Sequence, residues 1–164
     1  MAIVEEWAKR DVDGIFFSDD WGGQKGLLIN PEDWRKYYKP AYKEIFGLVR
    51  AKGLDVFLHS DGDISAIIPD LIECGVNVIH PVQPGAMDLR QLGEKYTGKL
   101  CFWGGIDCQK TLVRGIPHDI REEVCWLKKT LGTKKGGYIG GIHSFLPDVP
   151  KENILALYQA FLES

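Results

Sequence analysis

Short apolar runs alternate with amphipathic stretches along the whole chain. Runs of consecutive apolar residues predict five buried strands, at residues 14–17, 55–58, 76–79, 100–103 and 137–142. Between and after these runs, apolar residues recur every three or four positions, which predicts helices. The helices are expected over residues 30–53, 64–74, 88–93, 117–131 and 150–161. Continuous apolar strands separated by helices are typical of a parallel sheet that helices cover on both faces, so the pattern predicts an α/β fold.

Two of the predicted helices have clear end signals. Asn30 followed by Pro31 is typical of a helix start, because an Asn side chain caps the first turn and Pro has no N–H to leave unpaired. Gly75 follows the helix over 64–74, where a glycine can adopt the left-handed conformation that ends many helices. These signals support the predicted boundaries.

Composition narrows the class of protein. Hydrophobic residues make up 45% and charged residues 26%, which excludes a wholly disordered chain. The net charge of -3, without a basic block, disfavours a nucleic-acid or anionic-membrane partner, because such binding needs clustered cations. The four cysteines form no CxxC pair, which predicts free thiols in a reducing compartment. No signal peptide or apolar stretch of roughly 18 residues is seen, so we expect a cytoplasmic protein.

Polar residues gather where the apolar runs end. They are Asp19, Asp20, His59, Asp61, His80, Gln83, Asp107 and His143. Because the carboxyl ends of parallel strands meet at one edge of a sheet, where ligands bind, we expect these side chains to face a common volume. His118 instead opens a helix after Pro117, and we expect it on the surface.

The most specific local pattern is His59-Ser60-Asp61, with His143 after a later strand. Imidazole and carboxylate are ordinary ligands of zinc and ferrous iron, and two His with one carboxylate leave positions open for a substrate. A spacing of two on extended backbone directs both side chains to the same side. Two interpretations remain: a divalent metal on His59, Asp61 and His143, or hydrogen-bonding residues in a polar cleft without metal.

Asp19 and Asp20 form a second candidate site. Alternate positions of an extended chain diverge, so one carboxylate should face the cleft and the other the helix layer or solvent. A cleft Asp can act as a general acid or anchor an N–H-rich ligand, and the alternative is an Asp that caps a turn. Trp21, Trp103 and Phe145 lie at or after strand ends and can wall a flat ligand, although core packing is an equal alternative for Trp103.

The 19 glycines do not form a nucleotide-binding loop. No GxGxxG follows a strand and no GxxxxGK[ST] occurs, which argues against dinucleotide and nucleoside triphosphate sites. No Ser lies in a GxSxG elbow either. The glycines are better explained by sharp turns and close backbone approach at the strand ends.

The last strand–helix junction carries a family motif. Residues 143–153 read His-Ser-Phe-Leu-Pro-Asp-Val-Pro-Lys-Glu-Asn, which resembles the uroporphyrinogen decarboxylase family, whose superfamily includes the zinc-dependent corrinoid methyltransferases. Asp19-Asp20-Trp21-Gly22-Gly23 is similar to the decarboxylases' Asp-Ser-Trp-Ala-Gly, and residues 104–107 are similar to their Gly-Asn-Leu-Asp. The resemblance runs from Asp13 to Tyr158.

The resemblance implies the C-terminal portion of a TIM (β/α)8 barrel. A complete barrel takes about 250 residues, or roughly 31 for each unit. The 164 residues and five strand–helix units therefore correspond to about five βα units. We expect a single partial barrel domain over residues 1–164.

In the methyltransferase branch, zinc is bound by His-x-Cys and a later Cys. His59 matches that His, while Asp61 and His143 stand in the places of the two Cys. The resemblance thus implies metal-assisted methyl transfer of the corrinoid methyltransferase type. Zinc would be held by His59, Asp61 and His143, and the partner would be a corrinoid-type substrate or a corrinoid protein.

The decarboxylase branch is the alternative, and it needs no metal or cofactor. It implies a tetrapyrrole substrate, with Asp19 facing the pyrrole N–H groups and His143 positioning a carboxylate. In either branch we expect substrate contacts from the remaining strand-end residues: Asp20, Trp21, Gln83, Trp103 and Asp107.

A third hypothesis is a non-catalytic fragment, or a subunit of a split barrel. Whether the isolated chain is an enzyme therefore stays open. An incomplete barrel exposes strand edges and apolar interior, which predicts self-association or a complementing chain.

Overall fold

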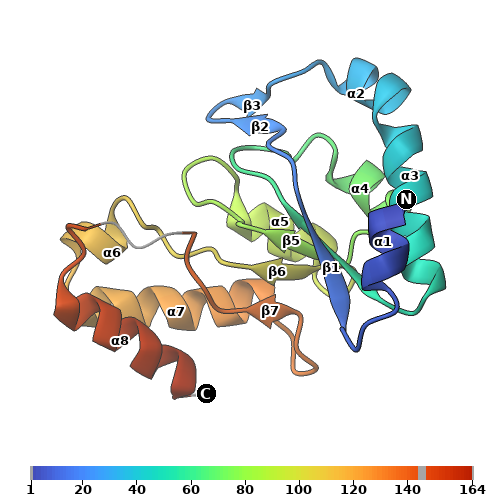
Figure 1. Cartoon of the computed structure of the whole chain (residues 1–164). Coiled ribbons are helices and arrows are strands. Elements are labelled where there is room, and N and C mark those ends of the chain that lie inside the picture. The colour runs from blue at the N-terminus through green and yellow to red at the C-terminus, as the bar shows by residue number, and fades with distance from the viewer. Residues whose placement is uncertain (1, 144–146, 164) are drawn as a thin grey trace. The chain divides into compact units, whose positions relative to one another are not determined.

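A computed structural model describes residues 2–143 and 147–163 of the chain. The fold is α/β, with a five-stranded parallel sheet in the order β1-β4-β5-β6-β7 (Figure 1). The strands are β1 (Gly14–Ser18), β4 (Asp55–His59), β5 (Val78–His80), β6 (Cys101–Trp103) and β7 (Tyr138–Ile139). All five predicted strands are confirmed, although β7 is shorter than its apolar run. The chain divides into two compact units, Met1–His80 and Pro81–Ser164, which are described in turn.

In the first unit, β4 is the central strand. It pairs with β1 from Gly14 opposite Asp55 to Ser18 opposite His59, and β5 pairs with its other edge. The remaining elements of this unit are α1 (Ala2–Trp7), the hairpin of β2 (Gly22–Gly23) and β3 (Gly26–Leu27), α2 (Pro31–Tyr37), α3 (Lys39–Ala51) and α4 (Ile68–Cys74).

The helix expected over residues 30–53 is in fact two helices. Asn30 caps α2 as predicted, because its side chain accepts the Glu32 N–H at 2.8 Å. The chain then breaks at Tyr38, between α2 and α3. Pro40 lacks an N–H and its ring obstructs the preceding turn, so one continuous helix cannot form across this point.

The helix expected over residues 64–74 is shorter than predicted, since α4 begins only at Ile68. Pro69 occupies its first turn, where a missing N–H costs nothing. The predicted end is confirmed: Gly75 caps α4 with φ 107°, in the left-handed region.

The core of the first unit lies between the sheet and α3 and α4. Trp34, Phe46 and Val49 are fully buried from the helix side, and Val56 and Leu58 are fully buried from β4. The apolar stripe of the predicted long helix is only partly buried, however. Its tyrosines differ in burial, with Tyr42 buried and Tyr37 exposed.

In the second unit, β6 and β7 pair in parallel, with Phe102 opposite Tyr138. The helices are α5 (Leu89–Tyr96), α6 (Thr111–Arg114), α7 (Pro117–Leu131) and α8 (Lys151–Leu162). The bounds of α7 match the prediction, and α8 lies alongside it (Figure 1). The short helix α6 was not predicted, because a single turn leaves too few residues to show a period.

Among the described helices, none is long and apolar enough to cross a membrane. All four cysteines are free thiols, as expected, and Cys74 is buried in the core of the first unit.

Asn153, the last residue of the family-like motif, is buried at the start of α8. Its side-chain amide donates to the carbonyl oxygens of Leu112 at 3.0 Å and Gly115 at 2.8 Å. Both acceptors belong to the segment that contains α6. One buried side chain therefore fixes α8 to this segment.

We expect Asn153→Ala to lower the free energy of unfolding by about 2 kcal/mol, because it leaves two carbonyl groups without their donor. Urea denaturation followed by circular dichroism measures the change. Leu155→Ala, on the exposed side of the same helix, is the control and should change stability by no more than about 0.5 kcal/mol. Equal stability of the two variants would contradict the assignment.

Candidate functional site

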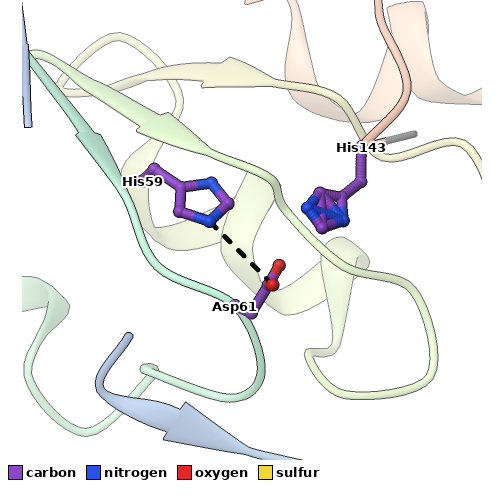
Figure 2. Close-up of side chains that lie close together, drawn as sticks. All are labelled: His59, Asp61 and His143. Carbon is purple, nitrogen blue, oxygen red and sulfur yellow. Dashed lines mark ion pairs between the residues drawn. The ribbon is translucent and has the colours of Figure 1, made fainter. Parts of the chain in front are cut away.

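The end of β4 brings an imidazole next to two carboxylates. His59 is the last residue of β4, and its Nε2 lies 3.9 Å from Asp61 Oδ2 (Figure 2) and 3.5 Å from Asp20 Oδ1. The His59 side chain is 13% exposed, whereas that of Asp20 is 58% exposed. Converging carboxylates beside a nearly buried ring nitrogen favour a bound cation at this point.

Glycines allow the two loops that carry these carboxylates to touch. A Cβ atom on Gly22 would collide with the backbone of residues 61–63, and a Cβ on Gly62 would collide with the backbone of Gly22. Gly62 also has φ +75°, which L side chains rarely adopt. Across this contact Asp20 Oδ1 accepts the Asp61 N–H at 3.1 Å, so the carboxylate of one loop holds the backbone of the other.

Asp19 and Asp20 turn to different sides. Asp20 faces His59, while Asp19 Oδ2 accepts a hydrogen bond of 2.6 Å from the Tyr42 hydroxyl on α3. The Trp21 indole N–H donates in turn to the Tyr42 oxygen at 2.8 Å. Burial raises the pKa of Tyr42, and the hydrogen bond to Asp19 raises it further, so the hydroxyl stays a donor.

Tyr42 is a site residue that the sequence did not reveal. It falls in the apolar stripe of its helix, where a tyrosine is indistinguishable from core packing. Trp21 is only half-buried: its ring packs against Tyr38 with centroids 4.6 Å apart, and its backbone N–H donates to Ser60 Oγ at 2.9 Å. Its role against a ligand stays a prediction.

His80 ends β5 directly opposite His59 in the strand register. The Nδ1 atoms of the two rings are 2.9 Å apart, and His80 is 8% exposed. The sequence placed His80 at a strand end but indicated no partner for it.

In the second unit, residues that follow the strands line a cavity of about 120 Å³. Gln83, Asp107 and His143 all line it, so three of the predicted site residues share one cavity. Trp103 is not among the lining residues; its indole lies against the backbone of Gly141. Phe145 lies outside the described residues.

Asp107 shapes one wall of this cavity. Its Oδ1 accepts the backbone N–H groups of Gln109 and Lys110, both at 2.9 Å, so the carboxylate closes the turn that leads into α6. The Asp107 N–H donates to Glu123 Oε1 on α7 at 3.0 Å.

Glu123 is a second residue that sequence reasoning missed. Burial raises the pKa of its carboxyl group, although the Asp107 N–H opposes that shift. A signal was present: Glu123 falls on the same helical face as Ile120, Val124 and Leu127, which are all buried. A carboxylate within an apolar stripe indicates a buried polar contact. His118, by contrast, is 70% exposed beside Glu122, as expected of a surface residue.

His59 and Asp61 are candidate metal ligands at the end of β4 (Figure 2), and His143 is the predicted third ligand. Each offers one ligand atom, two from imidazole and one from carboxylate. This donor set fits zinc or ferrous iron, and three protein ligands leave a coordination position for a substrate.

Comparisons with known proteins agree with the resemblance that the motifs suggest. A family model for uroporphyrinogen decarboxylase (URO-D) matches residues 1–163. Two curated uroporphyrinogen decarboxylases, from two strains of Thermus thermophilus, are each 28% identical over 152 residues. That alignment covers 90% of this chain but 40% of theirs.

A solved structure of a methyltransferase from Methanosarcina mazei matches with a TM-score of 0.74 and 20% identity. The match covers 99% of this chain and 45% of that one. The chain therefore spans less than half the length of these relatives. Together with the five parallel strands, this confirms the expected partial barrel.

We expect Glu123→Gln to stabilise the protein at neutral pH and to have little effect near pH 4. Because the folded state raises the pKa of Glu123, the folded protein binds more protons, and wild-type stability falls as pH rises above the ordinary value of 4.5. Glutamine keeps an acceptor for the Asp107 N–H but cannot ionise. Urea denaturation between pH 4 and 8 measures the difference.

Glu94→Gln, at an exposed position of α5, is the control and should follow the wild-type pH profile. A Glu123→Gln variant that loses stability equally at every pH would show that the carboxyl group is not the source of the pH dependence.

Proposed function

Since the chain belongs to the uroporphyrinogen decarboxylase family, we propose that it takes part in metal-assisted methyl transfer of the corrinoid methyltransferase type. The supporting observation is the pair at the end of β4, where His59 Nε2 and Asp61 Oδ2 are 3.9 Å apart. His143, which follows β7, is the proposed third ligand. These three residues occupy the positions that resemble the His, Cys and Cys ligands of the methyltransferase branch.

A divalent metal, zinc first, would act there as a Lewis acid and offer an open position to a substrate atom. Imidazole and carboxylate are harder ligands than thiolates, so this set would suit a harder substrate atom than the thiol-activating sites of the family. Two hydrogen bonds between the loops hold the proposed ligands in place. Asp20 Oδ1 accepts the backbone N–H of Asp61, and Ser60 Oγ accepts the backbone N–H of Trp21.

The remaining strand-end residues are proposed to contact the substrate. These are Asp20, Trp21, Gln83, Trp103 and Asp107. Gln83 and Asp107 line the cavity of the second unit, which supports their assignment. A corrinoid-type substrate or a corrinoid protein is the proposed partner.

Tetrapyrrole decarboxylation is the second candidate function. It is favoured by the names of the two Thermus relatives and by Asp19, whose carboxylate is oriented by Tyr42. In this mechanism Asp19 would stabilise the charge that develops on the pyrrole, and His143 would position a substrate carboxylate. No metal takes part.

A partner chain is the third element of the proposal. Within the first unit β1 pairs with β4 on one edge, and an apolar hollow lined by Trp7, Val12, Ile15 and Phe16 lies along β1. The chain also spans 40% of its curated relatives. We propose that a second copy or a complementing chain covers this surface, in a cytoplasmic assembly that suits the free thiols. In the non-catalytic alternative the chain would serve such an assembly only as a scaffold.

Purified protein should contain stoichiometric zinc, and His59→Ala should lose most of it, because the variant removes the most buried of the three proposed ligands. Inductively coupled plasma mass spectrometry gives the metal content. His118→Ala, which removes an exposed imidazole, should keep the wild-type content.

Equal zinc in wild type and His59→Ala would contradict the metal site. Incubation with uroporphyrinogen and analysis of the carboxyl number of the products then tests the second function. Loss of carboxyl groups that depends on Asp19 and not on zinc would replace methyl transfer with decarboxylation.

The chain should associate in solution, with a mass above the 18.5 kDa of one copy in light scattering at micromolar concentration. Trp7→Lys should weaken the association several-fold, because it places a charge in the hollow beside β1. Trp126→Lys, at a partly exposed position of α7, is the control. A stable monomer of the wild-type chain would rule out self-association and leave only a complementing chain.

A further inference from the structure

The parallel sheet has two outer edges, and among the described strands β1 and β7 each have a neighbour on one side only. Alternate residues of a strand direct their backbone N–H and C=O groups to opposite sides. The carbonyl groups of Gly137 and Ile139 accept N–H groups from β6 and the residue after it, so the backbone groups of Tyr138 point to the outer edge of β7. The Asp13 carbonyl accepts an N–H of β4, so the backbone groups of Gly14 point to the outer edge of β1. Such an edge is a template for pairing with a strand of another chain.

An apolar hollow of about 510 Å³ lies beside β7. Tyr138 lines it from the strand, and Tyr158 and Phe161 line it from α8. Leu155 and Leu162 lie on the same side of α8 as Tyr158, at helical spacing, and all three side chains are exposed. Helix α8 therefore carries an apolar stripe on its exposed side in addition to its buried side, which is typical of a helix that another segment covers.

The surface beside β1 has the same character. Trp7 and Phe16 line a hollow of about 330 Å³ along this strand. Trp7 is exposed on α1, as is Ile3 one turn before it. Both ends of the sheet thus combine an open strand edge with exposed apolar side chains, and covering them would remove this apolar surface from water.

Charges at the two ends of the sheet are opposite in sign. Residues 1–13, which lead into β1, include four acidic and two basic residues, whereas residues 124–143, which contain β7, include four lysines and no Asp or Glu. Asp11 and Asp13 shortly precede β1, Lys134 and Lys135 shortly precede β7, and all four are exposed. The amino ends of parallel neighbours lie side by side, so a β1 strand placed beside β7 would bring these opposite charges together.

We propose that β7 and α8 form a docking surface for a second copy of this chain, whose β1 pairs in parallel with β7 and whose α1 contributes Trp7 to the contact. The proposal rests on the proposed self-association of the chain and adds the surface that receives β1. The two surfaces differ, so the contact is head-to-tail: one copy offers β1 and the other offers β7.

Two variants that each disable one surface test the proposal. Trp7→Lys changes the surface beside β1, and Tyr158→Glu changes the surface formed by β7 and α8. Because every contact uses one surface of each kind, either variant alone should weaken the association several-fold in sedimentation velocity over a range of concentrations. Tyr37→Glu is the matched control: Tyr37 on α2 is 61% exposed, against 57% for Tyr158, and this variant should associate like wild type.

An equimolar mixture of the two variants is the decisive sample. It contains one intact pair of surfaces, the β7 surface of the Trp7→Lys chain and the β1 surface of the Tyr158→Glu chain. We expect the mixture to form a complex of twice the 18.5 kDa of one copy, at concentrations where each variant alone is a monomer. Far-UV circular dichroism and the thermal midpoint of each variant verify that the fold is retained.

A mixture that stays monomeric would overturn the proposal. So would association that Tyr158→Glu leaves unchanged, because β7 and α8 would then take no part in it. A wild-type chain that is itself monomeric would overturn both this contact and self-association, with a complementing chain as the remaining occupant. Zinc content tests the metal function separately, since none of the residues substituted here is a proposed ligand.

Discussion

The close approach of residues 19–23 to residues 59–63 is the constraint on which the site of the first unit depends. The two backbones come so close that only glycine fits at Gly22 and Gly62. The Asp63 N–H donates to the Gly23 carbonyl at 2.8 Å across the same contact. Because the loops are locked in this way, backbone contacts rather than apolar packing hold the carboxylates of Asp20 and Asp61 beside His59.

Helix α3 connects this contact to the core. Its face buries Phe46 and Val49, and the same face presents the Tyr42 hydroxyl to Asp19 and Trp21. Packing energy therefore orients polar groups: the helix cannot rotate to release Tyr42 without exposing its apolar residues. The second unit is organised in the same way. Glu123 on α7 and Asn153 on α8 lie on buried helix faces and hydrogen-bond to the backbone of the segment that follows β6. In both units, polar side chains on buried helix faces help to determine the geometry of the strand ends.

Much of this organisation could be predicted from local patterns. Runs of apolar residues located all five strands, and the three-to-four spacing located α7 to the residue. The break at Tyr38 was missed, although Pro40 signals it, because the apolar period continues through the proline. Strand β7 is shorter than predicted. The glycines on both sides of Tyr138 continue the apolar run, but few residues of that run form ladder hydrogen bonds.

The sequence by itself determined which residues stand at strand ends, because apolar runs and helical spacing are properties of neighbouring positions. It thereby identified His59, Asp61 and His143 as candidate ligands. Only the tertiary structure decided how these groups pair. Tyr42 donates to Asp19 across 23 positions and His59 meets His80 across 21, while Asp19 and Asp20 part to opposite sides. Such pairs arise from strand register and helix packing, which depend on contacts summed over the whole unit, and no local period records them.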